Sequence, residues 1–205
     1  MRALENLAVQ HVELDGYALD KDGQDKLLAL LSAGASTDCA RPLLDHALQL
    51  GARYVVVEAP YTDQDYSADF VSFYASAFKT YPRTTKRVHF FADDVSELLA
   101  YPFAQQAEAF DNGPDYLGFS VVRPLAQGPV GRTILRFPKF EGLIVRRAAR
   151  ASSKAHLLAV ELQVEGAPFI QQDTRVGACA QAAIWMASRP LSERHRQIGW
   201  HSVSQ

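Results

Sequence analysis

The sequence predicts an α+β fold, in which helices and strands occupy different stretches of the chain. Apolar residues recur at helical spacing in the first hundred residues, and short β-branched runs between Gly, Pro and Ser clusters follow from residue 115. An alanine-rich helical segment comes after these runs. We therefore expect N-terminal helices with two strands, then an antiparallel run of strands, then a helix that begins at Cys179.

Residues 1–114 are predicted to form a mainly helical part. The leucine run in DKDGQDKLLALLSAG and the segment RPLLDHALQLG, with Pro near its start and Gly at its end, are typical of helices. The runs ARYVVVEAP and KRVHFFADD predict the two strands, and DDVSELLAYPF predicts a further helix. Between the strands, Phe70, Phe73, Tyr74 and Phe78 recur at helical spacing, which predicts an amphipathic helix with its aromatic face in the core.

Residues 115–205 are predicted to form a strand-rich part that ends in the cysteine helix. The segments YLGFSVVRPL, GRTILRFP, EGLIVRRA and AHLLAVELQVEG are separated by turn-forming residues, as in antiparallel hairpins or a meander. Gly128, Pro129 and Gly131 predict a hairpin turn between the first two of these strands. No clear linker divides the chain at residue 114, so a single domain is an open alternative.

Composition and charge exclude several classes of protein. The 205 residues, 48% of them hydrophobic, are enough to bury a substantial core. A formal net charge of -2, without a long block of one sign, argues against nucleic-acid binding. No apolar run approaches the length of a membrane span and the first residues do not form a signal peptide, so we expect a cytoplasmic protein with no membrane partner.

The cysteines and the acidic residues give no sign of a metal or cofactor. Cys39 and Cys179 are too few for a disulfide framework, and neither has a second Cys or a His at the close spacing of a zinc site. Asp63, Asp65 and Asp69 lack the later glutamate of a calcium loop, so a cluster of acids at a helix N-terminus is the better interpretation. Since phosphate-binding and dinucleotide motifs are also missing, we expect no cofactor.

The segment GACAQAAIWMASR carries the strongest indication of chemistry. Helical spacing puts Cys179 on one face with Ala182 and Met186, and the cysteine lies in the first turn. There the free backbone amides and the helix dipole favour a thiolate, which lowers the pKa of the thiol from about 8.5. The side chain of Gln172, or that of Gln171, could direct an N–H group at the oxygen that becomes negative when the thiolate attacks a carbonyl.

Residues 168–189 resemble the active-site entry of papain-like cysteine peptidases, including the bacterial double-glycine-type peptidase relatives. The shared features are a Gln, a short loop with Gly, and a Cys that opens an Ala-rich helix containing an aromatic residue. The resemblance implies a cysteine hydrolase that cleaves an amide bond in a peptide or protein substrate. This sequence departs from the family in two ways: the spacing from Gln172 to Cys179 is one residue longer than usual, and Ala180 replaces a Gly.

A hydrolase of this kind needs a histidine as its general base. In the papain order this histidine follows the cysteine by well over a hundred residues, whereas only 26 residues follow Cys179 here. We therefore expect a fragment that ends before its base. The next candidate is His89, with His156 as the other strand histidine and His195 or His201 as further alternatives.

A second function, from a different class, stays open at this point. The chain could be a non-catalytic binding or assembly module, in which the helical and aromatic first part binds a partner and Cys179 is a core residue. Thiol reactivity separates the two hypotheses, because a core cysteine resists alkylation in the folded protein.

Overall fold

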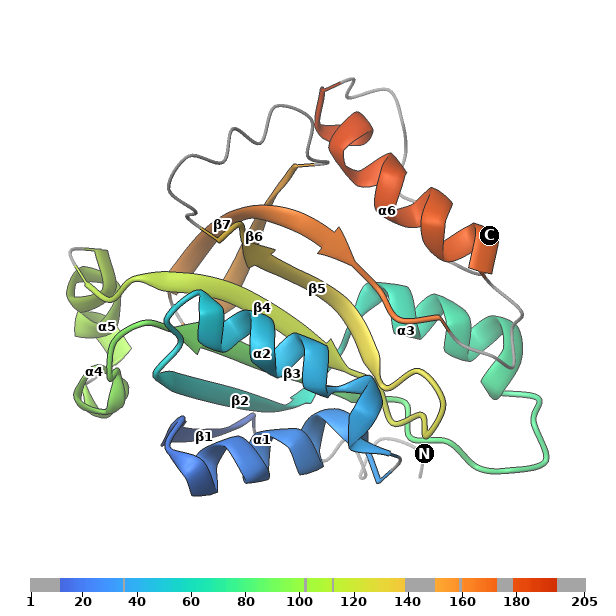
Figure 1. Cartoon of the computed structure of the whole chain (residues 1–205), viewed down its shortest axis with the longest axis horizontal. Helices are drawn as coiled ribbons and strands as arrows, with labels where there is room; N and C mark the ends of the chain where they lie inside the picture. The colour runs from blue at the N-terminus through green and yellow to red at the C-terminus, as the bar shows by residue number, and fades with distance from the viewer. Residues whose placement is uncertain are drawn as a thin grey trace, which may run out of the picture.

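The computed structural model describes residues 12–34, 36–101, 103–111, 113–138, 150–158, 160–172 and 179–194. Within these ranges one antiparallel sheet of seven strands is accompanied by six α-helices (Figure 1). The predicted α+β class is confirmed. The strand order β1-β2-β3-β4-β5-β7-β6 carries the sheet across residue 114, because β3 and β4 are paired neighbours.

The elements have the following bounds. The strands are β1 (Glu13–Ala18), β2 (Tyr54–Tyr61), β3 (Thr85–Phe91), β4 (Tyr116–Val122), β5 (Val130–Arg136), β6 (Ala151–Leu157) and β7 (Val160–Phe169). The α-helices are α1 (Lys21–Ser32), α2 (Arg41–Gln49), α3 (Gln64–Asp69), α4 (Ser96–Ala100), α5 (Phe103–Asp111) and α6 (Cys179–Arg194). A 3₁₀ turn, η1 (Thr37–Cys39), precedes α2, and a π-helical turn, η2 (Phe70–Tyr74), follows α3.

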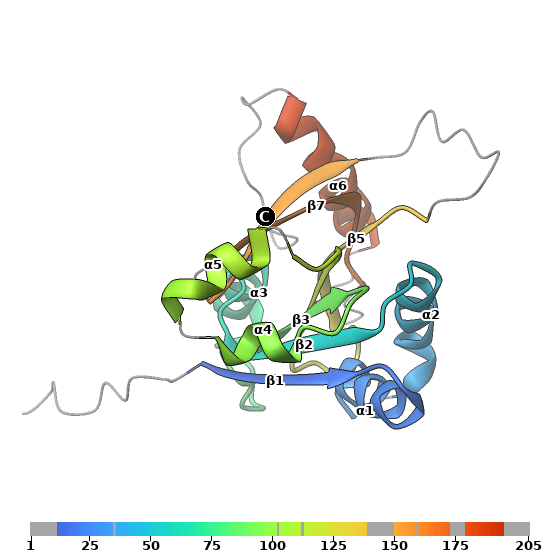
Figure 2. The ribbon, with the colours of Figure 1, turned by 90° about the vertical axis from the view of Figure 1, so that its left-hand side faces the viewer.

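The sheet curls, and its two faces are covered differently (Figures 1 and 2). On one face α1 and α2 pack Leu27 and Leu44 against Val55 and Val88 of the central strands. On the other face, which we call the concave face, Val56 and other strand residues pack against β6, β7, α4 and α5. The curl brings β6 over β3, where the Arg87 guanidinium donates a hydrogen bond to the backbone carbonyl of His156.

Three details of the predicted elements were wrong. The first part of the chain contains a third strand, β1, which pairs with the edge of β2. Its sequence ELDGYA carries two acids and a glycine, so it has the composition of an exposed edge strand and lacks an apolar alternation. The segment AHLLAVELQVEG is also divided, because the chain turns at Leu158, which has a φ of 54°, and β6 and β7 form a hairpin.

The predicted aromatic helix is shorter than expected and only partly buried. Helix α3 ends at Asp69 and the π-helical turn η2 ends at Tyr74, after which the chain is irregular. Tyr74 is buried, whereas Phe73 and Phe78 are exposed, so the aromatic residues do not form one core face. The segment EGLIVRRA lies outside the described residues.

Two predictions about loops and membranes can be compared directly with the structure. Gly128 has a φ of 87° in the turn between β4 and β5, which confirms the predicted hairpin and explains the glycine there, whereas Gly131 lies within β5. In the part of the chain that the structure describes, no helix combines the length and apolar character needed to cross a bilayer.

Candidate active site

The candidate active site lies where the chain passes from β7 to α6. After β7, Ile170 is buried and Gln171 continues beside β5, with its backbone N–H donating to the Val130 carbonyl at 3.0 Å. The side-chain oxygen of Gln171 accepts a hydrogen bond from the Val130 N–H, also at 3.0 Å. Gln172 is exposed, residues 173–178 lie outside the described ranges, and α6 begins at Cys179.

Arg123, at the end of β4, holds the segment that precedes the cysteine. Its guanidinium donates hydrogen bonds to the backbone carbonyls of Gly128 and, at 2.7 Å, of Gln171. The Arg123 side chain is buried, and burial lowers the pKa of this guanidinium from its ordinary value, against the opposing effect of nearby aspartates. The buried Arg123 guanidinium therefore joins the β4–β5 turn to the segment that contains Gln171 through charge-assisted hydrogen bonds.

Helix α6 is attached to α3 by hydrogen bonds to one carboxylate. The Trp185 indole donates its Nε1–H to Oδ1 of Asp65 at 3.0 Å, and the Arg189 guanidinium donates to the same oxygen at 3.1 Å. Ala182 and Trp185 are buried and pack with Ile170. The helix that begins at Cys179 is thus fixed on the concave face by a residue more than a hundred positions earlier in the sequence.

Asp65 belongs to a buried group of charges around the start of α3. Arg132 of β5 contacts both Asp63, at 2.9 Å, and Asp65, at 3.9 Å. Burial and the neighbouring Asp63 raise the pKa of Asp65, and the two arginines oppose that effect. Asp63 also caps α3, since its Oδ1 accepts a hydrogen bond from the Tyr66 N–H at 3.0 Å. The predicted acid cluster at a helix N-terminus therefore holds for Asp63, which caps α3, and for Asp65 in its first turn, whereas Asp69 is the last residue of that helix.

His89, the predicted base, lies on β3 and is fully buried on the concave face. Its Nδ1 is 3.0 Å from the Tyr116 hydroxyl, and its Nε2 is 3.5 Å from Oε2 of Glu58. Glu58 also pairs with Arg87 at 2.7 Å. Both ring nitrogens of His89 therefore face groups on neighbouring strands, and its pairing with Cys179 stays a prediction.

The pKa values of this buried group favour a neutral histidine beside a charged carboxylate. Burial lowers the pKa of His89 and outweighs the attraction of Glu58. Burial alone would raise the pKa of Glu58, but the hydrogen bond from His89 and the charge of Arg87 lower it. Burial raises the pKa of Tyr116, so its hydroxyl stays protonated. In the tautomer that carries its proton on Nε2, His89 accepts a hydrogen bond from this hydroxyl at Nδ1 and directs its Nε2–H at Glu58.

The other histidine and cysteine candidates are placed as follows. His156 is exposed on β6, with its Nε2 3.5 Å from Glu161. His195 and His201 lie outside the described residues. Cys39 is the last residue of η1, far from α6 in the sequence. Among the residues that the structure describes, no group of three or more His, Cys, Asp or Glu side chains is arranged to hold a metal ion.

Sequence reasoning missed the residues that hold the site together. Arg123 carried no motif, Trp185 was noted only as the aromatic residue of the cysteine helix, and Asp65 had been assigned to an acid cluster at a helix N-terminus. The sequence did offer a chemical signal. Arg123 follows an apolar strand and Asp65 lies in a segment rich in aromatic residues, and a charged side chain that is buried in such surroundings needs a polar partner. The partners themselves come from distant elements, so the sequence could not name them.

The chain was compared with protein-family models, with curated proteins and with solved structures, and none of the three comparisons found a match. The function must therefore be argued from the residues and their geometry.

Proposed function

We propose that this chain is a papain-like cysteine hydrolase, a peptidase that uses Cys179 as its nucleophile. The observation that carries the proposal is the pair of buried anchors on either side of the cysteine. Arg123 fixes the glutamine segment before it, and Asp65 fixes the helix after it. A nucleophile and its oxyanion donor must be held in register before substrate arrives, and two rigid attachments supply that condition.

The roles of the residues follow from this placement. The Cys179 thiolate attacks the substrate carbonyl carbon, a carbon–sulfur bond forms, and the carbonyl oxygen becomes negative. Gln172 donates its side-chain N–H to that oxygen. Gln171 is the alternative candidate, and its side-chain oxygen accepts a hydrogen bond from the Val130 N–H, which holds this side chain beside β5. The leaving amine departs with a proton from the histidine base, and water then hydrolyses the thioester.

The attack step can be tested separately from the base. With p-nitrophenyl acetate as the probe, the thiolate displaces p-nitrophenolate and Cys179 becomes acetylated, which needs no proton donor because the leaving group departs as an anion. We expect acetylation at Cys179 to outpace acetylation at Cys39, as read by mass spectrometry of the native protein. Labelling at equal rates, or at Cys39 alone, would contradict the nucleophile assignment.

The oxyanion role of Gln172 has its own control. A tetrahedral oxyanion forms during acetylation but not during alkylation by iodoacetamide, so Gln172→Ala should slow acetylation about tenfold or more and leave alkylation unchanged. Gln181→Ala, on the exposed face of α6, is the matched control and should change neither rate. If Gln172→Ala leaves acetylation unchanged, the oxyanion donor is a different group.

A binding module is the second candidate, and one observation favours it. Val71 and Phe73 of η2 and Phe78 after it are exposed apolar side chains close together in the sequence. Exposed groups of this kind mark association surfaces. If the partner is a second copy of this chain, the protein should self-associate with rising concentration in sedimentation velocity, and Phe73→Ser should weaken that association. If the protein is monomeric at all concentrations and Cys179 is reactive, the results exclude self-association and favour the hydrolase.

A further inference from the structure

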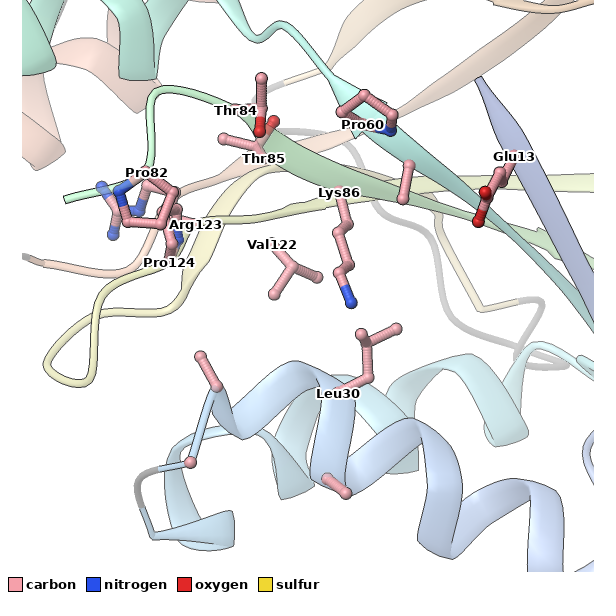
Figure 3. A pocket seen from close by; sticks show the side chains of 14 residues that line it. Glu13, Leu30, Pro60, Pro82, Thr84, Thr85, Lys86, Val122, Arg123 and Pro124 are labelled. Carbon is pink, nitrogen blue, oxygen red and sulfur yellow. The ribbon is translucent and has the colours of Figure 1, made fainter. Parts of the chain in front are cut away.

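A hollow of about 730 Å³ lies on the opposite side of the sheet, between the C-terminal end of α1 and the ends of β2, β3 and β4 (Figure 3). Its volume falls within the range of roughly 300 to 1,000 Å³ that small-molecule sites occupy. Apolar side chains supply most of its walls, among them Leu30 from α1, Pro60 from β2 and Val122 from β4. A ligand in this hollow would therefore need an apolar body.

Lys86 places a positively charged ammonium group in this hollow. Its side chain leaves β3 and extends between the sheet and α1 toward Leu30 (Figure 3). Among the residues that the structure describes, no carboxylate lies within ion-pair distance of its ammonium group. Arg123 also lines the hollow, but its guanidinium is bound to the carbonyls of Gly128 and Gln171. The ammonium of Lys86 is thus the cationic group that a ligand could pair with.

The surroundings of Lys86 favour a single negative charge on the ligand. Glu13 lines the same hollow, and its carboxylate would repel a second negative charge. Ala29 and Leu30 of the last turn of α1 line it, together with Ala33 and Gly34 directly after the helix, and the backbone carbonyls at this end of a helix carry partial negative charge. A phosphate dianion would be repelled by both the Glu13 carboxylate and the helix carbonyls. A carboxylate carries a single negative charge, which the Lys86 ammonium neutralises.

The hollow also has room for an extended apolar chain. A second hollow of about 370 Å³ shares Glu13, Leu30, Ala59 and Lys86 with the first and continues along α1 past Val57 and Tyr17. Lys26 and Asp15 also line it, and they are paired with each other at 2.8 Å. The two spaces form one groove with the ammonium of Lys86 in the region that they share. A linear chain can therefore lie against α1 on one side of its charged head group.

We propose that this groove binds a small carboxylic acid with an apolar chain, whose carboxylate forms an ion pair with Lys86. The chain packs against Leu30, Pro60 and Val122, and Glu13 excludes ligands with two negative charges. The inference does not depend on the reactivity of Cys179, since it uses the other face of the sheet.

Octanoate is a suitable probe, measured by isothermal titration calorimetry on the full chain. We expect saturable binding that Lys86→Gln weakens about threefold, because Lys86 is exposed and water screens the ion pair that this substitution removes. Lys86→Arg should retain most of the affinity. Lys21→Gln, an exposed lysine at the opposite end of α1, is the matched control and should bind as the wild type does. Ala29→Tyr, on the exposed rim of the hollow, should weaken binding by narrowing it.

Three results would overturn the proposal. Octan-1-ol that binds as tightly as octanoate would show that the carboxylate is not recognised. Inorganic phosphate that binds as tightly as octanoate would show that the apolar walls and Glu13 do not select the ligand. Octanoate binding that is absent, or that either Lys86→Gln or Ala29→Tyr leaves unchanged, would show that the carboxylate does not bind beside Lys86 in this groove.

Discussion

The two faces of the sheet are stabilised by different interactions. Beneath α1 and α2 the buried groups are apolar and mostly aliphatic, with Leu27 and Leu31 packed on the central strands. On the concave face a buried charge is paired with a partly buried one, Asp65 with Arg189 and Arg87 with Glu58. Apolar burial has no direction, so it accepts many arrangements, whereas a buried ion pair requires one partner in one position. The concave face therefore determines where α6, and with it Cys179, is placed.

The largest expected effect of a substitution on the concave face comes from Asp65→Ala. It leaves the Trp185 indole N–H and the Arg189 guanidinium without the carboxylate that both contact. Removing one partner of a buried pair costs about 3–5 kcal/mol in the free energy of unfolding. Urea unfolding should show this loss, and Asp25→Ala, at an exposed position of α1, should stay within about 0.5 kcal/mol of the wild type. If the two substitutions lower the free energy of unfolding equally, Asp65 does not hold α6 in place as we infer.

The next effect is expected on the apolar face. Leu27 is fully buried between α1 and the sheet, so Leu27→Ala removes apolar contacts and leaves a cavity. Large-to-small changes of this kind cost about 2–5 kcal/mol. We also expect Leu27→Met to cost less than about 1.5 kcal/mol, because aliphatic packing accepts a side chain of similar volume. If Leu27→Met costs as much as Leu27→Ala, the apolar face is as specific as the concave one.

A smaller loss is expected for Arg123→Met. The carbonyl of Gln171 would lose its buried donor, and an unsatisfied buried group costs about 1–3 kcal/mol. The substitution should also slow alkylation of Cys179 without changing that of Cys39, because Arg123 positions the segment before α6. A loss of stability with no change in Cys179 reactivity would limit Arg123 to a structural role.

The buried His89 predicts a dependence of stability on pH. Burial lowers its pKa below the ordinary value of about 6.5, so on acidification the unfolded chain binds a proton before the folded one does. Neutral His89 makes its full contribution to the free energy of unfolding above about pH 6.5. As the pH falls below that value, the free energy of unfolding decreases by up to about 1.4 kcal/mol per pH unit. His89→Gln should flatten the change in urea midpoint between about pH 7.5 and 5.5. An unchanged slope in that variant would contradict the assignment to His89.

The smallest effect is expected at the β6–β7 hairpin. Lys154 and Glu161 form a cross-strand ion pair at 2.7 Å, but both side chains are exposed and water screens their attraction. Lys154→Ala should therefore leave the urea midpoint unchanged within error. A clear loss of stability would show that exposed pairs matter to this sheet as much as buried ones do.

The same contrast explains how much of the structure the sequence could predict. The α+β class, helices α1 and α2 and strands β2 to β5 follow from local periodicity and turn residues, which act within a few positions. The turn at Leu158 has no Gly, Pro or Asn to mark it, so β6 and β7 were predicted as one strand. The site depended on distant partners: no local pattern connects Asp65 with Trp185, or Arg123 with Gln171.

The hydrolase proposal depends most directly on the state of the Cys179 thiol. The measurement is the rate of iodoacetamide alkylation at each cysteine as a function of pH, read by mass spectrometry on native protein and again in urea. The account predicts that Cys179 reaches half its maximal rate at a lower pH in the native protein than in urea, and that native Cys39 shows no such shift. A native Cys179 that reacts more slowly than in urea at every pH, or with the same pH dependence, would contradict it.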